Sequence, residues 1–229
     1  MFQCRPVTAP ARFGSTDPRT GDGVPVARLA ASQRKRQRRI VDAAMRLAEK
    51  GGLEAVRLRD VAEASDVALG TLYKYFHGKE DILLFALTEE VEKLEAAFGA
   101  RLPRGRSPLE RLTEFFKQAT RGLTRKPHFA RAVLRSLACG DVETAEKVAR
   151  FHLRMTRLIV AALRGEPPDL GAEPTVSAGT DRERQVAFIL QNVWFSTLVG
   201  WASGLHPARA VAEHVRTAAA LMRTRAEED

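Results

Sequence analysis

Apolar residues recur along most of the chain with the spacing of amphipathic helices. From Ile40 to Ala48, for example, they fall at positions i, i+3, i+4, i+7 and i+8, which places them on one face of a helix. No segment shows the alternating pattern that is typical of a strand. We therefore predict an all-α fold. The expected helices lie at about 34–50, 58–64, 69–75, 79–98, 107–124, 128–138, 141–164, 182–203 and 207–223.

The predicted helix ends carry their own sequence signals. Gly51 and Gly52 end the first helix, because glycine adopts the left-handed conformation of a helix C-terminus at little cost. Ser107, Pro108 and Glu110 combine an N-cap, a first-turn proline and the third-position acid of a capping box. These residues place helix boundaries near 51 and 107.

Three regions follow from this pattern. Residues 1–30 are rich in Pro, Gly, Thr and Arg without any period, which predicts a disordered basic tail. Residues 31–84 hold the short helices of a small helix-turn-helix domain. Residues 85–229 predict a larger helical bundle, which exceeds what DNA reading alone requires.

The charge of the chain points to a polyanionic partner. The 37 Lys and Arg outnumber the 28 Asp and Glu, which gives a formal net charge of +9. A basic excess of this size favours nucleic acid first and an anionic membrane surface second. Residues 34–39 place five positive charges in six positions. That run has two interpretations: a solvated helix start, or a segment that contacts phosphates or enters the minor groove as an arm.

Cysteine content and hydropathy bear on location. Cys4 and Cys139 do not suggest a disulfide framework, which suits a reducing compartment. The first 30 residues contain no apolar run fit for a signal peptide, and no stretch approaches the roughly 18 apolar residues of a membrane-spanning helix. We therefore expect a cytoplasmic protein without a membrane partner.

The segment 57–82 predicts two short helices joined by a tight turn. Ala62 is small enough for a close helix contact, and Val61, Val67 and Leu72 supply an apolar interior. Helical hairpins are common, so this pattern alone only suggests a helix-turn-helix. The second helix would enter the major groove of DNA.

The stretch Gly70–Phe76, followed by Lys79 and Ile82, closely resembles the recognition-helix signature of the TetR family of transcriptional repressors. The stretch Asp66–Tyr73, together with Asn192–Trp201, looks like the actinobacterial cholesterol-catabolism repressors within that family. Three further stretches agree with the family in order and spacing: Ile40–Ala44, Gly51–Gly52 and Leu58–Ala62.

The resemblance and the helix positions together select candidate DNA contacts. Arg59 is the candidate for a bidentate contact to guanine, and Gly70 would let the backbone approach the DNA. For Tyr73 and Phe76 the alternative is packing in the core. The full set of candidates is Arg39, Arg59, Leu69, Gly70, Thr71, Tyr73, Lys74, Tyr75 and Lys79.

Two positions depart from the usual family pattern. Asp66 stands in the turn where the family often has glycine, so a left-handed residue would carry some strain there. Ala68 replaces the usual serine cap of the next helix, and losing a cap costs about 0.5–2 kcal/mol. We expect Asp66 or a DNA phosphate to satisfy the exposed N–H groups.

The larger region offers candidates for a ligand cavity. The resemblance implies that helices 4–7 surround a cavity and that the last two helices form the interface of a homodimer. Aromatic residues and few inward charges suggest an apolar effector, although ordinary core packing is the alternative for each residue. The candidate ligand contacts are Phe115, Phe129, Leu134, Phe151, Met155 and Trp194, with Phe116, Phe188, Phe195 and Trp201 as further wall residues.

Catalytic chemistry finds little support in the sequence. No Ser/His/Asp set, phosphate loop or zincin spacing appears, so we expect no enzyme, cofactor or metal site. His152 is expected to be a core histidine with a hydrogen-bond partner. Arg131, Arg135 and Arg154 lie on solvated helix faces or pair with an acidic ligand group.

The favoured function is a ligand-responsive regulator, a repressor that binds a palindromic operator as a dimer and is released by a hydrophobic molecule. Such a molecule would belong to lipid or steroid metabolism or to drug efflux. Two alternatives stay open: a helical carrier or enzyme of hydrophobic thioesters, and a non-specific architectural DNA binder.

Overall fold

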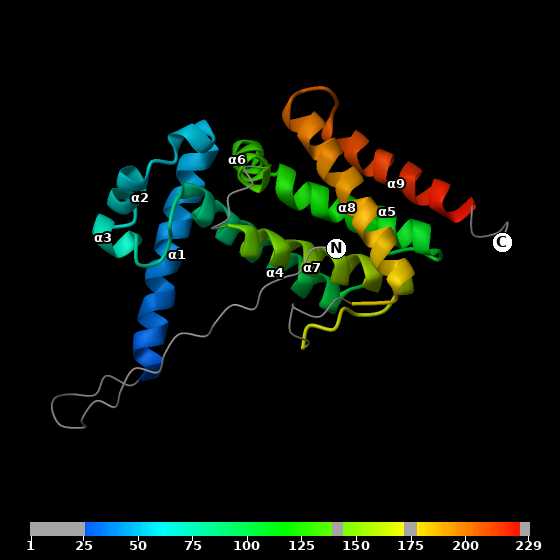
Figure 1. Cartoon of the computed structure of the whole chain (residues 1–229), viewed down its shortest axis with the longest axis horizontal. Coiled ribbons are helices and arrows are strands. Elements are labelled where there is room, and N and C mark those ends of the chain that lie inside the picture. The colour runs from blue at the N-terminus through cyan, green and yellow to red at the C-terminus, as the bar shows by residue number, and fades with distance from the viewer. Residues whose placement is uncertain (1–25, 139–143, 172–177, 225–229) are drawn as a thin grey trace, which may run out of the picture.

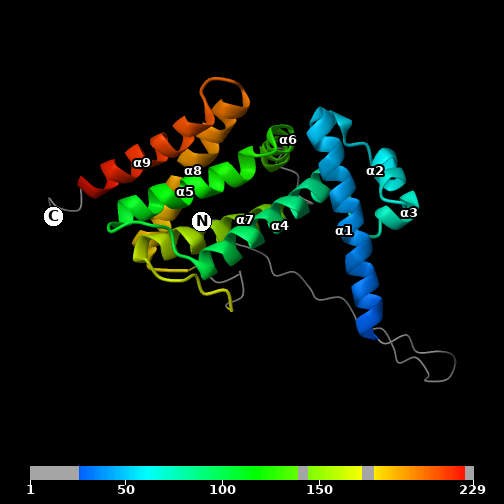
Figure 2. The same cartoon turned by 180° about the vertical axis from the view of Figure 1, so that it is seen from behind.

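The computed structural model describes residues 26–138, 144–171 and 178–224, and the regular structure within these ranges is entirely helical (Figures 1 and 2). The prediction of an all-α fold is therefore confirmed. The elements are α1 Val26–Gly51, η1 Leu53–Ala55, α2 Leu58–Ala64, α3 Leu69–Leu72, α4 Lys79–Ala100, α5 Pro108–Thr124, α6 Pro127–Ala138, α7 Ala145–Arg164, α8 Asp181–Ala202 and α9 Ala208–Thr224.

Two of the predicted boundaries differ clearly from the structure. Helix α1 begins at Val26 rather than near residue 34, so residues 26–30 are helical and not part of a tail. No glycine or proline interrupts residues 26–50, and nothing in that stretch ends a helix earlier. Helix α3 ends at Leu72 rather than near residue 75, because the chain tightens there into i→i+3 hydrogen bonds. The predicted tail 1–25 and the predicted start of α7 at 141–143 lie outside the described residues.

The molecule has two parts, which we call the head (α1–α3 with η1) and the body (α4–α9). Figure 1 shows the head at one end and α5, α8 and α9 toward the other, with α4, α6 and α7 between them. One continuous apolar core runs through both parts. In the head it is built from Ile40, Val41, Val61 and Leu72, all fully buried. Helix α4 carries that core into the body.

Two helices of the body, α5 and α8, begin with side-chain caps. Ser107 accepts a hydrogen bond from the Glu110 backbone N–H at 3.2 Å, and the Glu110 carboxylate accepts from the Arg106 N–H at 2.7 Å. The predicted start of α5 is therefore confirmed. At α8, Thr180 and Glu183 form a complete capping box. None of the described helices is long and apolar enough to cross a membrane.

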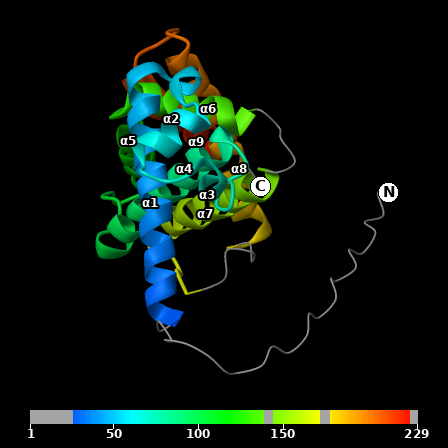
Figure 3. The ribbon, with the colours of Figure 1, turned by 90° about the vertical axis from the view of Figure 1, so that its left-hand side faces the viewer.

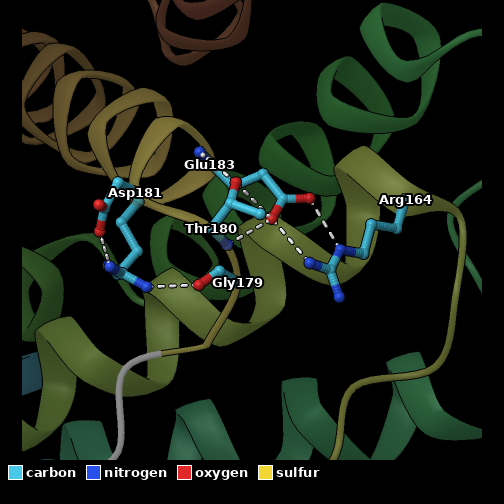
Figure 4. Close-up of polar contacts among 6 residues, drawn as sticks. Arg164, Gly179, Thr180, Asp181 and Glu183 are labelled. Carbon is cyan, nitrogen blue, oxygen red and sulfur yellow. Dashed lines mark hydrogen bonds and ion pairs between the residues drawn. The ribbon is translucent and has the colours of Figure 1, made fainter.

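A clamp joins the end of α7 to the start of α8 (Figure 4). Arg164 donates from Nε and Nη2 to the two carboxylate oxygens of Glu183, each at 2.7 Å. Hydrogen bonds from Arg164, ahead of those from Thr180, lower the pKa of the Glu183 carboxyl to about 2. One carboxylate thus caps α8 and holds the last turn of α7.

Candidate DNA interface and ligand cavity

The turn between α2 and α3 is a Schellman motif. The Val67 N–H donates to the Ala62 carbonyl at 3.0 Å, and the Asp66 N–H donates to the Glu63 carbonyl at 3.1 Å. This pairing requires a left-handed residue at Asp66, whose φ is 52°. The expected left-handed aspartate is therefore confirmed. Such a turn is short and rigid, and it sets the angle at which α3 leaves α2.

Arg39 of α1 braces this turn. Its Nη2 donates to the Asp66 backbone carbonyl at 3.1 Å, and its Nη1 lies 3.4 Å from the Asp66 carboxylate. Arg39 was predicted as a DNA contact, and the structure gives it an internal partner. The Asp66 carboxylate thus faces Arg39, and Ala68 gives α3 no side-chain cap. Within the described residues, Asp66 therefore does not serve as the cap that we expected.

The remaining candidate DNA contacts differ in exposure. Arg59, Gly70 and Lys74 are exposed, and Tyr73 is 53% exposed, which argues against a core role for Tyr73. Phe76 is buried and packs edge-on against Phe85 at 5.6 Å, so the core interpretation is correct for Phe76. The half-buried candidates are Leu69, Thr71, Tyr75 and Lys79.

The half-buried candidates have structural partners as well. Leu69 and Tyr75 pack against the core, which holds α3 against the head. Lys79 donates to the Leu53 carbonyl at 3.4 Å and lies 3.9 Å from Glu54, so it also fixes η1. Helices α2 and α3 lie side by side at the far end of the head (Figures 1 and 3). The structure thus places the exposed candidate Arg59 on α2, and Tyr73 and Lys74 directly after the neighbouring α3.

The body contains an apolar cavity of about 170 Å³. Leu134, Phe151 and Trp194 line it, as predicted, and Phe195 joins them. A smaller cavity of about 60 Å³ shares several of these walls and includes Met155. The side chains common to both are Leu87, Leu123, Phe151 and Trp194.

Several of the predicted wall residues lie elsewhere. Phe115 and Phe129, also predicted as ligand contacts, are buried in the core and border neither of these two cavities. Phe115 stacks edge-on with Phe98 and Phe116 instead. Phe188 is 68% exposed on the outer face of α8. Aromatic content alone cannot separate a core side chain from a cavity wall, because both are apolar.

The cavity has a small polar edge that sequence reasoning missed. His152 Nδ1 lies 3.0 Å from Gln191 Oε1, and Gln191 Nε2 donates to Thr156 Oγ1 at 2.8 Å. With the amide in this orientation Nδ1 donates, which leaves Nε2 as an acceptor in the neutral ring. His152 is an exposed residue and not the core histidine that we expected. Asn192 completes this edge, and the polar pair 191–192 within an apolar helix was the available signal.

The arginines considered as ligand partners are engaged within the protein. Arg154 pairs with Glu95 at 3.0 Å and with Glu92 at 3.2 Å. Burial raises the pKa of the Glu95 carboxyl, against the lowering effect of Arg154. Arg131 donates to the Ala202 carbonyl at 3.1 Å and lies over the Trp201 ring, and Arg135 pairs with Glu54 at 3.1 Å. These contacts join helices rather than face the cavity.

Polar contacts link α6 to the head and α7 to the start of α4. Glu49 of α1 accepts a hydrogen bond from the Phe129 N–H in the first turn of α6, at 3.2 Å. Lys147 of α7 pairs with Asp81, which is 3% exposed at the start of α4. Lys147 also lies over the Phe76 ring, 5.7 Å from its centre. A shift of α6, which borders the cavity, therefore reaches the head directly, and a shift of α7, which also borders it, reaches Phe76 and Asp81, where the chain passes from the head into α4.

A helix-turn-helix head joined to a helical body with an apolar cavity defines a DNA-binding regulator with its own sensor domain. The chain belongs to the TetR family: the model for bacterial regulatory proteins of the tetR family matches residues 40–85, and the tetracyclin repressor-like C-terminal domain matches residues 105–222. It is a transcriptional regulator of that family. No cluster of three or more metal-ligating side chains occurs in the described residues.

Curated relatives agree with this assignment. The HTH-type transcriptional repressor KstR of Rhodococcus jostii is 36% identical over 191 residues, which cover 83% of this chain and 84% of that protein. KstR of Mycolicibacterium smegmatis is 32% identical over 192 residues, 83% of this chain and 88% of that protein. These relatives confirm the resemblance predicted from the Asp66–Tyr73 stretch.

The fold also matches that of a solved structure. A TetR regulator from Rhodococcus sp. RHA1 superposes with a TM-score of 0.71 at 23% identity, over 83% of this chain and 96% of that chain. At this identity the match supports the fold, and the family assignment rests on the sequence matches.

Proposed function

We propose that the chain is a homodimeric repressor that binds a palindromic operator and leaves it when an apolar molecule enters the body. One observation carries this proposal: a single chain joins an exposed α2–α3 face to an apolar cavity through buried contacts. Arg59, Gly70 and Thr71 would meet base edges, while Tyr73, Tyr75 and Lys79 would position the helix on phosphates.

The cavity sets the chemistry of the effector. Its walls are aliphatic and aromatic, and its polar groups lie together at His152, Gln191 and Asn192. An apolar molecule with one polar group fits this arrangement, because that group would meet the free Nε2 of His152 or the amide of Asn192. Rotation of Phe151 and Trp194 would join the two cavities and admit an elongated ligand, such as a lipid or steroid.

An exposed apolar surface supports the homodimer. Phe188 and Val199 of α8 are 68% and 41% exposed, and Leu221 of α9 is 68% exposed. Large apolar side chains on neighbouring helices favour association, because a soluble monomer rarely leaves them in water as a group. The resemblance to the family assigns the same two helices to the dimer interface. Two heads would then meet successive major grooves about 34 Å apart.

Ligand release requires that the effector bind one head arrangement better than the other. The contacts Glu49–Phe129 and Lys147–Asp81 would supply a route, since α6 and α7 both border the cavity, α6 contacts the head, and α7 contacts the start of α4 next to the head. An effector that pushes these helices apart would change the spacing of the two heads.

The proposal is tested by titrating the protein against the DNA upstream of its own gene, with a scrambled duplex of equal length as control. We expect a preference for the upstream duplex of at least about a thousandfold, as for specific regulators. An affinity that is equal for both duplexes and depends only on the salt concentration would contradict a specific repressor and favour an architectural DNA binder.

The second alternative, a carrier or enzyme of hydrophobic thioesters, makes a different prediction in the same samples. Mass spectrometry of small molecules retained by the purified protein would identify a bound thioester. Retention or turnover of a thioester, together with no affinity for either duplex, favours that alternative. A retained apolar molecule that weakens binding to the upstream duplex supports the repressor.

A further inference from the structure

The N-terminal turns of α1 extend beyond the head. From residue 31 onward the first buried residue of the helix is Ile40, and the side chains of residues 31–35 are all exposed. Figures 1 and 3 show these turns continuing past α3, away from the body. A short helical segment without tertiary packing is marginal in water, so these turns require some other stabilisation.

The charge of this segment is uncompensated. No Asp or Glu occurs between Val26 and Val41. Arg38 pairs with Glu89 and Arg39 with Asp66, whereas Arg34, Lys35 and Arg36 form no ion pair with any residue that the structure describes. Like charges four residues apart destabilise a helix, as for Arg34 with Arg38 and Lys35 with Arg39. A polyanion beside these turns would remove this cost.

The contact of Arg39 with Asp66 fixes which way the segment faces. Lys35 and Arg36 precede Arg39 by four and three residues, so they lie on its face of the helix, one turn further out. That face is turned toward the loop that leads into α3, because Arg39 touches Asp66. Arg34 precedes Arg38 by four residues and lies on the face directed toward Glu89 of α4.

We propose that Lys35 and Arg36 bind backbone phosphates of the same duplex that α3 reads, outside the base pairs that α3 contacts. This inference rests on the proposed DNA binding and adds a second, sequence-independent anchor to it. A helix is about 10–12 Å across, whereas the minor groove is about 6 Å wide. The segment therefore lies against the backbone, and the interpretation of residues 34–39 as a minor-groove arm does not hold.

Three single variants test the inference, each removing one positive charge: Lys35→Gln, Arg36→Gln and, as the matched control, Arg34→Gln. Binding to the upstream duplex is measured by fluorescence anisotropy over a series of salt concentrations. The logarithm of the association constant falls linearly with the logarithm of the salt concentration. Each lost phosphate contact makes this line less steep by about 0.9, or about 1.8 for a dimer. We expect this loss for the first two variants, an unchanged slope for Arg34→Gln, and an unchanged preference over scrambled DNA.

A second measurement uses a shorter duplex that contains only the bases protected by α3 and lacks the flanking phosphates. On it the slopes of Lys35→Gln and Arg36→Gln should equal that of the unsubstituted protein. Equal slopes for all three variants on the long duplex overturn the inference, and so does a changed sequence preference, which would mean base reading. The unsubstituted protein could show no sequence preference while the salt slopes of Lys35→Gln and Arg36→Gln still differ from that of Arg34→Gln. That result would support the phosphate contacts and contradict the proposed specific repressor. Circular dichroism confirms that each variant is folded.

Discussion

In the head, one of the two aromatic side chains predicted to contact DNA is exposed and the other is half-buried, whereas in the body most of the predicted aromatic side chains are buried. Tyr73 is 53% exposed on the face of α3, and Phe115 is fully buried between Phe98 and Phe116. Under the proposed function, the head would present part of its chemistry outward to a large, rigid polyanion, and such residues can stay out of the core. The body would enclose its ligand, so wall and core would be made of the same residue types.

The difference explains why sequence reasoning succeeded unevenly. A helix-turn-helix needs a small residue at Ala62 and a left-handed residue at Asp66, and both needs can be read from the chain. A cavity is the space left by many side chains, and no local pattern records it. Aromatic content therefore selected Phe115 and Phe129 as readily as Phe151.

Stability gives the largest expected contrast between the two parts. Phe115→Ala should lower the free energy of unfolding by about 3–5 kcal/mol, because it leaves a cavity in a close-packed core. Tyr73→Ala should lower it by about 0.5 kcal/mol or less, because the ring is largely in water. Urea denaturation of both variants measures the difference. Similar losses in the two variants would mean that Tyr73 is a core residue and not a DNA contact.

DNA affinity should show the opposite contrast. Thr71→Ala should weaken binding to the upstream duplex by about 1–2 kcal/mol, since it removes a hydroxyl and a methyl that face the DNA under the proposed function. Thr113→Ala is the matched control, because Thr113 is a half-buried threonine on α5 that donates only to the Leu109 carbonyl. Anisotropy titration checks both. An unchanged affinity for Thr71→Ala removes this residue from the interface.

The fold was more predictable than the site, and the misses have physical reasons. The end of α2 followed from the turn at Asp66 and the start of α5 from its cap, and both signals act locally. The early start of α1 was missed because composition assigned residues 26–30 to the tail and the charged run 34–39 was taken as the start of the helix, although no glycine or proline lies between Val26 and Arg34. The internal partner of Arg39 was missed because it lies 27 residues away, across a tertiary contact that no spacing reveals.

The turn that orients α3 offers a smaller effect within the head. Asp66→Gly and Asp66→Ala both lose the carboxylate that faces Arg39, so their difference isolates the cost of φ at 52°. Alanine in the left-handed region costs about 1 kcal/mol more than glycine. Asp66→Ala should therefore be less stable than Asp66→Gly by about that amount in urea denaturation. Equal stability of the two variants would show that the turn relaxes to another conformation.

The clamp in the body gives the smallest effect, and it depends on pH. The pKa of Glu183 is about 2 in the folded protein against an ordinary value of 4.5, so its carboxylate stabilises the fold above pH 4.5 and loses that contribution as the pH falls toward 2. Arg164 is 42% exposed, and solvent screening keeps the contribution to about 1 kcal/mol or less at neutral pH. Glu183→Gln should therefore be less stable than the unsubstituted protein at pH 7 and equally stable near pH 2. Glu63→Gln in the head is the control, because the described residues give Glu63 no ion pair. Its difference in stability from the unsubstituted protein should be the same at pH 7 and near pH 2. Parallel stability curves for the unsubstituted protein and Glu183→Gln would mean that the clamp of α7 and α8 contributes no free energy.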